Sequence, residues 1–142
     1  MPDAALKRYA EFFELLTAER LALLDGVMTD DVYFTDPFNS VRGIEKVRGV
    51  FADMYTQLSD ARFAVTHAAM AEDGSGLLRW ELNGKLRRTG EPWHVEGMSQ
   101  VRFGPDGRVS EHVDYWDAAR QFYERLPVVG WLLRRIRARI AH

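Results

Sequence analysis

The segment VYFTDPFNSVRG, residues 32–43, places a carboxylate at the end of an apolar run. The first residues of the segment are β-branched and aromatic, which is typical of a buried strand. Pro37 ends this strand, because its ring fixes φ and its nitrogen has no hydrogen to donate. Asp36 is therefore expected at a strand end, where a carboxylate either acts on a ligand or caps a turn.

An amphipathic helix is predicted on each side of this strand. After Asp3, which can cap a helix, apolar residues recur at helical spacing, and the pattern continues weakly to Val27. After Gly43, apolar residues are again three and four positions apart. The two apolar stripes are Leu6, Tyr9, Phe13 and Leu16 upstream, and Ile44, Val47, Phe51, Met54 and Leu58 downstream.

From Ala61 onward the apolar period changes to two, which is typical of strands with one buried face. Turn-rich sequences separate the strands, so an antiparallel meander is predicted, with the two helices covering its apolar face. The order of helix, short strand, helix and long strands indicates an α+β fold. The four long segments are RFAVTHAAM (62–70), GLLRWELNGKL (76–86), EPWHVEGMSQVRF (91–103) and RVSEHVDYW (108–116).

Length and composition favour a single main domain, residues 1–126, followed by a separate C-terminal segment. With 142 residues the chain can bury a sizeable core. It has no cysteine, which excludes disulfides and thiol catalysis. No apolar run is long enough to cross a bilayer and the first residues do not resemble a leader, so a cytoplasmic protein is expected.

Charge is distributed unevenly along the chain. Residues 118–142 contain six arginines and one glutamate, a net charge of +5, so residues 1–117 carry −7 of the total of −2. An acidic body argues against a nucleic-acid partner, which would require a basic face on the domain. Asp117 is predicted to cap a helix over residues 118–126.

The C-terminal segment, residues 127–142, is predicted to be a basic amphipathic helix. Pro127 and Gly130 separate it from the preceding helix. Two interpretations compete: the helix covers its own domain or a dimer partner, or it makes peripheral contact with an anionic membrane. The apolar stripe contains Val128, Val129, Leu132, Leu133, Ile136 and Ile140, with Arg134, Arg135, Arg137 and Arg139 mainly elsewhere and Trp131 near the start.

The order of elements, together with FTDPFNSVRGIEKVRGVF (34–51) and GRVSEHVDYWD (107–117), resembles the SnoaL-like group of the nuclear transport factor 2 superfamily. This resemblance covers about residues 5–117. It implies a strongly curved antiparallel sheet wrapped around the N-terminal helices as a cone that holds a small apolar ligand. Ketosteroid isomerase, polyketide cyclases and limonene epoxide hydrolase share this architecture. The resemblance also implies a homodimer and chemistry without a cofactor.

Comparison with ketosteroid isomerase makes Asp36 a candidate catalytic residue. Aligned on FTDP, Asp36 corresponds to the aspartate that shuttles protons in that enzyme. The same alignment places Phe12 at the position of the oxyanion-hole tyrosine, and a second alignment places Ser99 at the position of a protonated aspartate. Since two donors to an enolate are missing, ketosteroid isomerisation itself is not expected. Tyr9, one helical turn from Phe12, is an alternative source of a hydroxyl.

The last strand makes Asp114 the second catalytic candidate. The sequence EHVDYWD resembles the pattern EHWD of the cyclases and the pattern RDYFD of the hydrolase, and both comparisons select Asp114. His112 and Trp116 share its strand face and are candidate binding residues. His112 either tunes Asp114 or forms an ordinary side-chain pair with it.

The hydrolase comparison adds Tyr33, Arg79 and Glu81 as candidate binding residues. Tyr33 corresponds to a water-positioning tyrosine, and Arg79 and Glu81 stand two apart on one strand face, as an arginine and an aspartate do in that enzyme. Arg79 and Glu81 lie on the face opposite to Trp80. The alternative is therefore a surface ion pair on the convex side of the sheet.

The pattern contains residues that can ligate a metal, but no metal site is predicted. His94 with Glu96 and His112 with Asp114 form two His-x-acid pairs on strands expected to be neighbours. Such spacing arises by chance on any polar strand face, and the related cone proteins usually need no metal.

The favoured function is binding of a small, apolar, oxygenated molecule, with cofactor-free acid/base isomerisation, cyclisation or dehydration. One alternative is an epoxide hydrolase of the limonene type. The other is a non-catalytic ligand-binding or dimerisation module, which a cone filled by Trp80, Trp93 and Trp116 would favour. Whether the protein is an enzyme at all stays open at this point.

Overall fold

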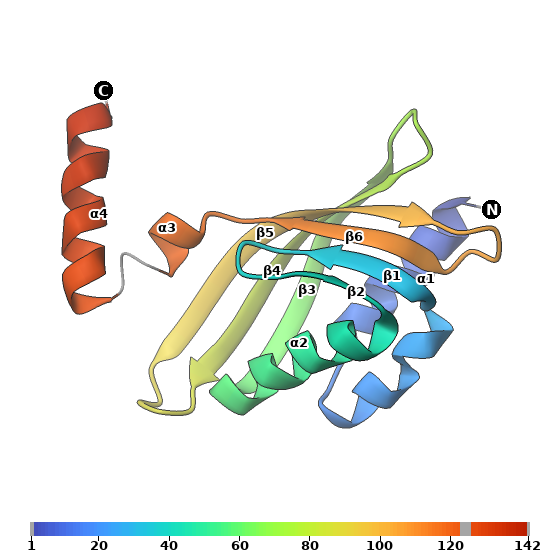
Figure 1. The fold of residues 1–142 in the computed structure, drawn as a ribbon, viewed down its shortest axis with the longest axis horizontal. Coiled ribbons are helices and arrows are strands. Elements are labelled where there is room, and N and C mark those ends of the chain that lie inside the picture. The colour runs from blue at the N-terminus through green and yellow to red at the C-terminus, as the bar shows by residue number, and fades with distance from the viewer. Residues whose placement is uncertain (1, 123–125, 142) are drawn as a thin grey trace.

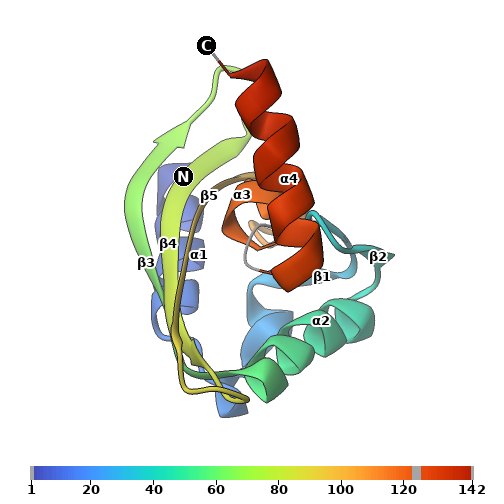
Figure 2. The same ribbon diagram turned by 90° about the vertical axis from the view of Figure 1, so that its left-hand side faces the viewer.

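A curved sheet of six strands forms the body of the molecule, and two N-terminal helices pack on its inner face (Figure 1; Figure 2). The structure, a computed structural model, describes residues 2–122 and 126–141. The expected α+β architecture is confirmed. Its helices and strands, in chain order, are α1 (Pro2–Glu14), η1 (Glu19–Gly26), β1 (Met28–Thr35), β2 (Ser40–Arg42), α2 (Ile44–Gln57), β3 (Leu58–Met70), β4 (Gly76–Leu86), β5 (Pro92–Phe103), β6 (Val109–Tyr115), α3 (Ala118–Gln121) and α4 (Pro127–Ile140).

The strands lie in the order β2-β1-β6-β5-β4-β3. β3 to β6 form the antiparallel meander that the period-two segments predict. β1 and β6, however, run parallel, with Phe34 opposite His112. The sequence predicts the antiparallel meander but not this pairing of β1, which is the parallel pair of the sheet. The parallel pairing brings the FTDP segment beside the strand that carries Asp114.

The first helix ends earlier than the weak apolar pattern suggests. α1 stops at Glu14, and η1 is a separate 3-10 helix whose Leu21 and Leu24 are buried. The Thr17 hydroxyl accepts a hydrogen bond from the Arg20 backbone N–H at 3.2 Å. Such a local bond competes with continuation of the helix, which explains the break.

α2 begins directly after a glycine whose backbone conformation other residues rarely adopt. Gly43 has a φ of 104°, in the region that favours glycine, and its N–H donates to the Val32 carbonyl at 2.8 Å. This sharp turn directs α2 back across the sheet. The apolar face of α2 is buried through Ile44, Val47 and Phe51.

The core between helices and sheet is rich in aromatic rings. Phe13 makes edge-to-face contacts with Tyr9 at 5.0 Å and with Phe63 at 5.8 Å between ring centroids. The same ring lies 5.5 Å from Phe51 of α2. α1, α2 and β3 are thus held together by one cluster of rings, and the inner face of the sheet is closed at this end.

Beyond β6 the chain forms two further helices. Asp117 caps α3 as expected, accepting a hydrogen bond from the Arg120 N–H at 2.9 Å. The helix predicted over residues 118–126 ends at Gln121, and residues 123–125 of that prediction lie outside the described residues. α4 stands apart from the sheet and from α1 and α2 in Figure 1.

Candidate functional site

A cavity of about 480 Å³ opens between α2 and the inner face of β4, β5 and β6. Its lining is mainly apolar and aromatic, with a few polar groups, as is usual for small-molecule sites. Trp80, Trp93 and Trp116 line this space and do not fill it. Asp36 and Asp114, the two predicted catalytic residues, both border it.

Asp114 projects from β6 and is held by two donors on one oxygen. Its side chain is 14% exposed. Oδ1 accepts hydrogen bonds from the Ser99 hydroxyl at 2.5 Å and from His112 Nε2 at 2.6 Å. Ser99 lies directly opposite Asp114 in the β5–β6 register. Since both bonds use Oδ1, the second oxygen, Oδ2, remains for a molecule in the cavity.

His112 receives support from a helix at the far end of the sequence. The Tyr9 hydroxyl of α1 lies 2.6 Å from His112 Nδ1. Burial, and to a smaller extent the charge of Asp114, raise the pKa of Tyr9 well above its usual value of 10.0. Tyr9 therefore stays protonated and its hydroxyl donates a hydrogen bond to Nδ1. A neutral His112 that accepts at Nδ1 carries its hydrogen on Nε2, which faces Asp114.

A tryptophan closes the other end of this hydrogen-bond chain. Trp80 Nε1 donates to the Ser99 hydroxyl at 2.8 Å, so that hydroxyl is free to donate its own hydrogen to Asp114. Gly97, opposite Trp80 in the β4–β5 register, gives the indole its space, because a Cβ there would lie 2.5 Å from Trp80 Cζ2. The polar chain, defined here as Tyr9, His112, Asp114, Ser99 and Trp80, thus spans α1, β6, β5 and β4.

Three members of the polar chain were not predicted as site residues. The sequence comparison named Tyr9 only as an alternative source of a hydroxyl and Ser99 only as a place where an expected acid is missing, and Trp80 was considered as a side chain that could fill the cone. In the structure Ser99 is 3% exposed and bonded on both sides. A buried hydroxyl on the same strand face as Val95 and Val101 was the available signal, since such a group needs partners.

Asp36 borders the cavity but is also engaged in its own turn. Its Oδ1 accepts the backbone N–H groups of Phe38 at 2.8 Å and Asn39 at 2.7 Å, and the Asn39 side-chain amide at 3.1 Å. The turn joins β1 to β2, a short strand that the sequence-based prediction did not include. Both roles named for a carboxylate at this strand end therefore remain compatible with its position, and its catalytic role stays a prediction.

Tyr33, Arg79 and Glu81, which were expected to bind a ligand, are not among the residues that line this cavity. Tyr33 bonds Ser40 at 2.7 Å, with the Arg42 guanidinium over its ring. Arg79 pairs with Glu96 at 3.3 Å on the outer face of the sheet. Because alternate residues of a strand face opposite sides, the inward Trp80 turns its neighbours outward. The constellation of the limonene hydrolase is therefore not assembled around Asp114.

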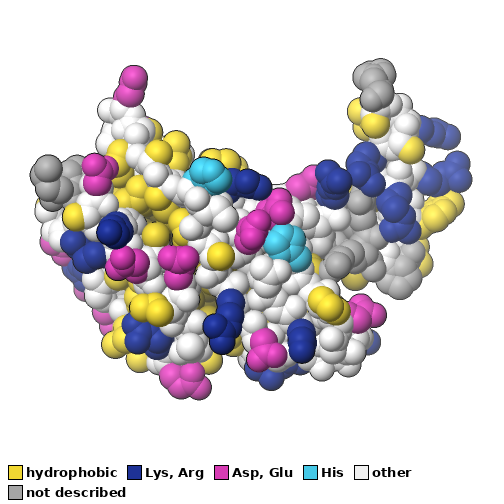
Figure 3. Space-filling view, turned by 180° about the vertical axis from the view of Figure 1, so that it is seen from behind, with side chains coloured by type: hydrophobic (Ala, Val, Ile, Leu, Met, Phe, Trp, Pro, Cys, Tyr) yellow, Lys and Arg dark blue, Asp and Glu magenta, His cyan; other side chains and the backbone are white. Residues whose placement is uncertain are grey.

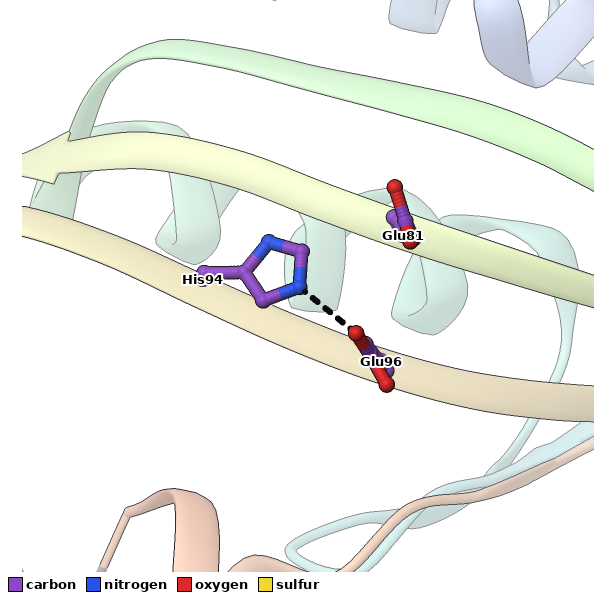
Figure 4. A group of neighbouring side chains, drawn as sticks. All are labelled: Glu81, His94 and Glu96. Atoms are coloured by element: carbon purple, nitrogen blue, oxygen red, sulfur yellow. Dashed lines mark hydrogen bonds and ion pairs between the residues drawn. The ribbon is translucent and has the colours of Figure 1, made fainter.

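The two His-x-acid pairs lie on opposite faces of the sheet, so they do not form a joint metal site. His112 and Asp114 point inward, whereas His94 and Glu96 lie outside beside Glu81 (Figure 4). Potential ligand atoms of this outer cluster lie within 4.8 Å of one another. His94 Nε2 is 3.1 Å from Glu96 Oε1, and bonds from His94 and then Arg79 lower the pKa of Glu96. Glu96 thus pairs with both Arg79 and His94 on the outer face of the sheet.

Among the described residues, no helix has both the length and the apolar character needed to cross a bilayer. This holds for α4 as well, which has 14 residues and several arginines.

Comparisons with solved structures agree with the architecture. An NTF2-like protein of unknown function from Exiguobacterium sp. 255-15 superposes with a TM-score of 0.69 at 20% identity, over 80% of this chain and 98% of its own. A hypothetical protein from Catenulispora acidiphila with a ketosteroid isomerase-like fold, solved with trimethylamine, gives 0.71 at 17% identity, over 89% and 95%. TsrD from Streptomyces laurentii gives 0.70 at 19% identity, over 83% and 94%. At such identities the likeness concerns the fold alone.

A sequence comparison with curated proteins finds no match. The family model described as the SnoaL-like domain, in contrast, matches residues 9–112, which is most of the chain. The matched range runs from Tyr9 to His112, the two ends of the bond between α1 and β6. The expected resemblance is thereby confirmed: the chain belongs to the SnoaL-like group of the nuclear transport factor 2 superfamily.

Proposed function

We propose that the protein binds a small, mostly apolar, oxygenated molecule in its cavity and catalyses cofactor-free proton transfer, with Asp114 as the base. One observation carries this proposal: a carboxylate faces an apolar cavity while buried donors hold its other oxygen. A carboxylate at the edge of a dry space is well placed to remove a proton from a bound molecule. The aromatic walls supply contact area for the apolar part of the ligand.

The proposed step is removal of a proton from a carbon next to a carbonyl group. Asp114 Oδ2 takes the proton, and the electron pair of the broken C–H bond moves into the carbonyl to form an enolate. Return of the proton to another carbon gives isomerisation, attack of the enolate on a second carbonyl gives cyclisation, and loss of a hydroxyl group as water gives dehydration. The side-chain amide of Gln57, in the lining, offers N–H groups to the ligand oxygen.

Ser99, His112 and Tyr9 act as positioning residues in this proposal. Ser99 and His112 hold Oδ1 by bonds of 2.5 and 2.6 Å, which orients Oδ2 toward the cavity. Oδ1 can accept both hydrogen bonds whether Oδ2 carries a proton or not, so proton uptake requires no rearrangement behind the carboxylate. Tyr9 maintains the His112 tautomer that makes this arrangement possible.

Deuterium exchange tests the base whichever of these reactions the protein catalyses. The purified protein is incubated in D₂O with a panel of cyclic ketones and enones, and deuterium incorporation is measured by mass spectrometry. The wild type should label at least one compound next to its carbonyl, and Asp114→Asn should lower that rate at least a hundredfold, a usual effect of losing a general base. Glu81→Gln, a matched change on the outer face, should label like the wild type.

Ligand retention separates catalysis from simple binding. Native mass spectrometry of the purified protein, followed by identification of any released molecule, establishes what the cavity holds. A retained apolar molecule with no exchange by any variant would overturn the catalytic part and leave a binding module. Equal exchange by wild type and Asp114→Asn would overturn the role of Asp114.

A further inference from the structure

α4 presents a continuous apolar stripe that no other described part of the chain covers. Val128 is 78% exposed and Ile140 69% exposed, at opposite ends of the helix. Trp131, Leu132 and Ile136 between them are each about half exposed. Isolated apolar side chains on a surface are ordinary, but a stripe along a whole helix marks an interaction surface.

The charges of α4 are all positive, and two of its arginines border this stripe. The helix has four arginines and no acidic residue. At about 100° per residue, Arg135 and Arg137 fall on the two sides of the apolar arc. The Arg135 guanidinium lies over the Trp131 ring, 5.0 Å from its centroid. Figure 3 shows the basic side chains gathered over this helix, at the right of the view.

We propose that α4 docks in the plane of a lipid surface that carries anionic headgroups. The apolar stripe would enter the boundary between headgroups and acyl chains, while arginine stems lie along it and their guanidinium groups reach the phosphates. Charge complementarity favours this occupant, because α4 carries four arginines and no acidic residue beside its exposed apolar stripe. The acidic body would be repelled by the same surface, so docking places α4 on the lipid and turns the body away.

Vesicle sedimentation with the full chain tests this docking. Vesicles of equal parts phosphatidylcholine and phosphatidylglycerol should carry the protein into the pellet at low salt, and vesicles of phosphatidylcholine alone should not. Added salt should release it. Arg135→Gln with Arg139→Gln should weaken partitioning roughly twenty-fivefold, at about fivefold for each charge near the surface. Ile136→Asp should also weaken it, because a carboxylate then enters the apolar stripe.

A matched charge change on the body serves as the control. Lys85→Gln with Arg88→Gln removes two exposed positive charges from the region of the β4–β5 turn and should leave partitioning within about twofold of the wild type. Protein that stays in the supernatant at low salt overturns the proposal. Equal partitioning by the two α4 variants and the body control also overturns it. Sedimentation velocity gives the remaining outcome: if Ile136→Asp turns a dimer into a monomer and vesicles bind neither form, a second copy covers α4 and the lipid proposal is wrong.

Discussion

The Tyr9 hydroxyl and His112 Nδ1 lie 2.6 Å apart, although 103 positions separate the two residues in the chain. Tyr9 does not line the main cavity, yet through His112 it acts on the carboxylate of Asp114, which does. α1 therefore contributes to the site without lining the cavity, because Tyr9 fixes the tautomer and orientation of the His112 ring. A change in α1 can alter the cavity carboxylate without touching a ligand.

Replacement of Tyr9 by phenylalanine should lower stability and change its pH dependence. Near neutral pH the variant should lose about 1–3 kcal/mol, because His112 Nδ1 remains buried without a donor. In the unfolded chain the hydroxyl ionises near pH 10.0, whereas burial raises its pKa in the folded protein. Above that pH the unfolded state binds fewer protons, so the free energy of unfolding falls as pH rises.

Urea unfolding at pH 10 and pH 11 measures this effect. The wild type should lose about 1 kcal/mol more over that interval than Tyr9→Phe, as expected for one group that titrates in the unfolded state only. Tyr115→Phe removes a hydroxyl from an exposed side chain and should keep the pH dependence of the wild type. Parallel curves for wild type and Tyr9→Phe would contradict the buried, protonated state of Tyr9.

Ser99→Ala should measure what the two hydrogen bonds of the Ser99 hydroxyl contribute, because it removes the hydroxyl and keeps the Cβ. Trp80 Nε1 loses its acceptor and Asp114 loses one donor, so we expect a loss of about 1–3 kcal/mol in the free energy of unfolding. The indole N–H resonance of Trp80 should shift, and the exchange rate assigned to Asp114 should fall with ligand affinity little changed. Ser110→Ala is the matched control, because the Ser110 hydroxyl bonds a backbone carbonyl near the surface. It should leave the Trp80 resonance and the exchange rate unchanged.

Gly97→Ala should destabilise the protein through a steric contact. The new Cβ would lie 2.5 Å from Cζ2 of Trp80, and the bond from Trp80 to Ser99 resists retreat of the ring. Overpacking of this kind costs about 1–3 kcal/mol. Gly49→Ala in α2 meets no atom within 4 Å and should instead stabilise by about 0.5–1 kcal/mol, as alanine does inside a helix. The midpoint temperature of thermal unfolding should therefore fall for Gly97→Ala and rise for Gly49→Ala.

The sequence predicts the strands of the meander well, because alternation with a period of two marks which residues face inward. The same alternation places Trp80 inward and Arg79 and Glu81 outward, and the structure agrees with it against the hydrolase comparison. Periodicity on a strand is a local property of the chain, so it predicts the direction of a side chain more reliably than a residue-by-residue comparison with a distant relative. The surface ion pair considered for Arg79 is found, with Glu96 as its partner.

The polar chain, in contrast, depends on information that a single sequence does not contain. Ser99 meets Asp114 and Trp80 only because the β5–β6 and β4–β5 registers place them together. Tyr9 reaches His112 only because α1 crosses the inner face of the sheet. The parallel pairing of β1 with β6 is equally non-local. Asp114 was found because it matches a motif, and His112 because it is two positions away on the same strand, whereas Ser99, Trp80 and Tyr9 have no sequence spacing that links them to Asp114.

Substitutions of Asp36 distinguish a structural role of its carboxylate in the turn from a catalytic role in the cavity. Asp36→Ala removes the acceptor of two backbone N–H groups and should cost about 1–2 kcal/mol of stability, as loss of a capping side chain does. Asp36→Asn keeps an oxygen at the same position, so the turn and most of the stability should remain. If the carboxylate serves only the turn, which its bonds favour, Asp36→Asn should also keep deuterium exchange within a few-fold of the wild type.

The same variant decides whether Asp36 shares the chemistry with Asp114. An amide cannot accept a proton from a ligand as a carboxylate does, so a catalytic Asp36 would make Asp36→Asn lose a hundredfold or more while unfolding at the same urea concentration as the wild type. Phe38→Leu, at the exposed ring beside the same turn, controls for effects on the cavity wall alone. The backbone N–H groups of Phe38 and Asn39 bond Oδ1, whereas Oδ2 accepts only the longer bond of 3.3 Å from the Asn39 side-chain amide, so a loss confined to Asp36→Asn would assign the reaction to Oδ2 of Asp36.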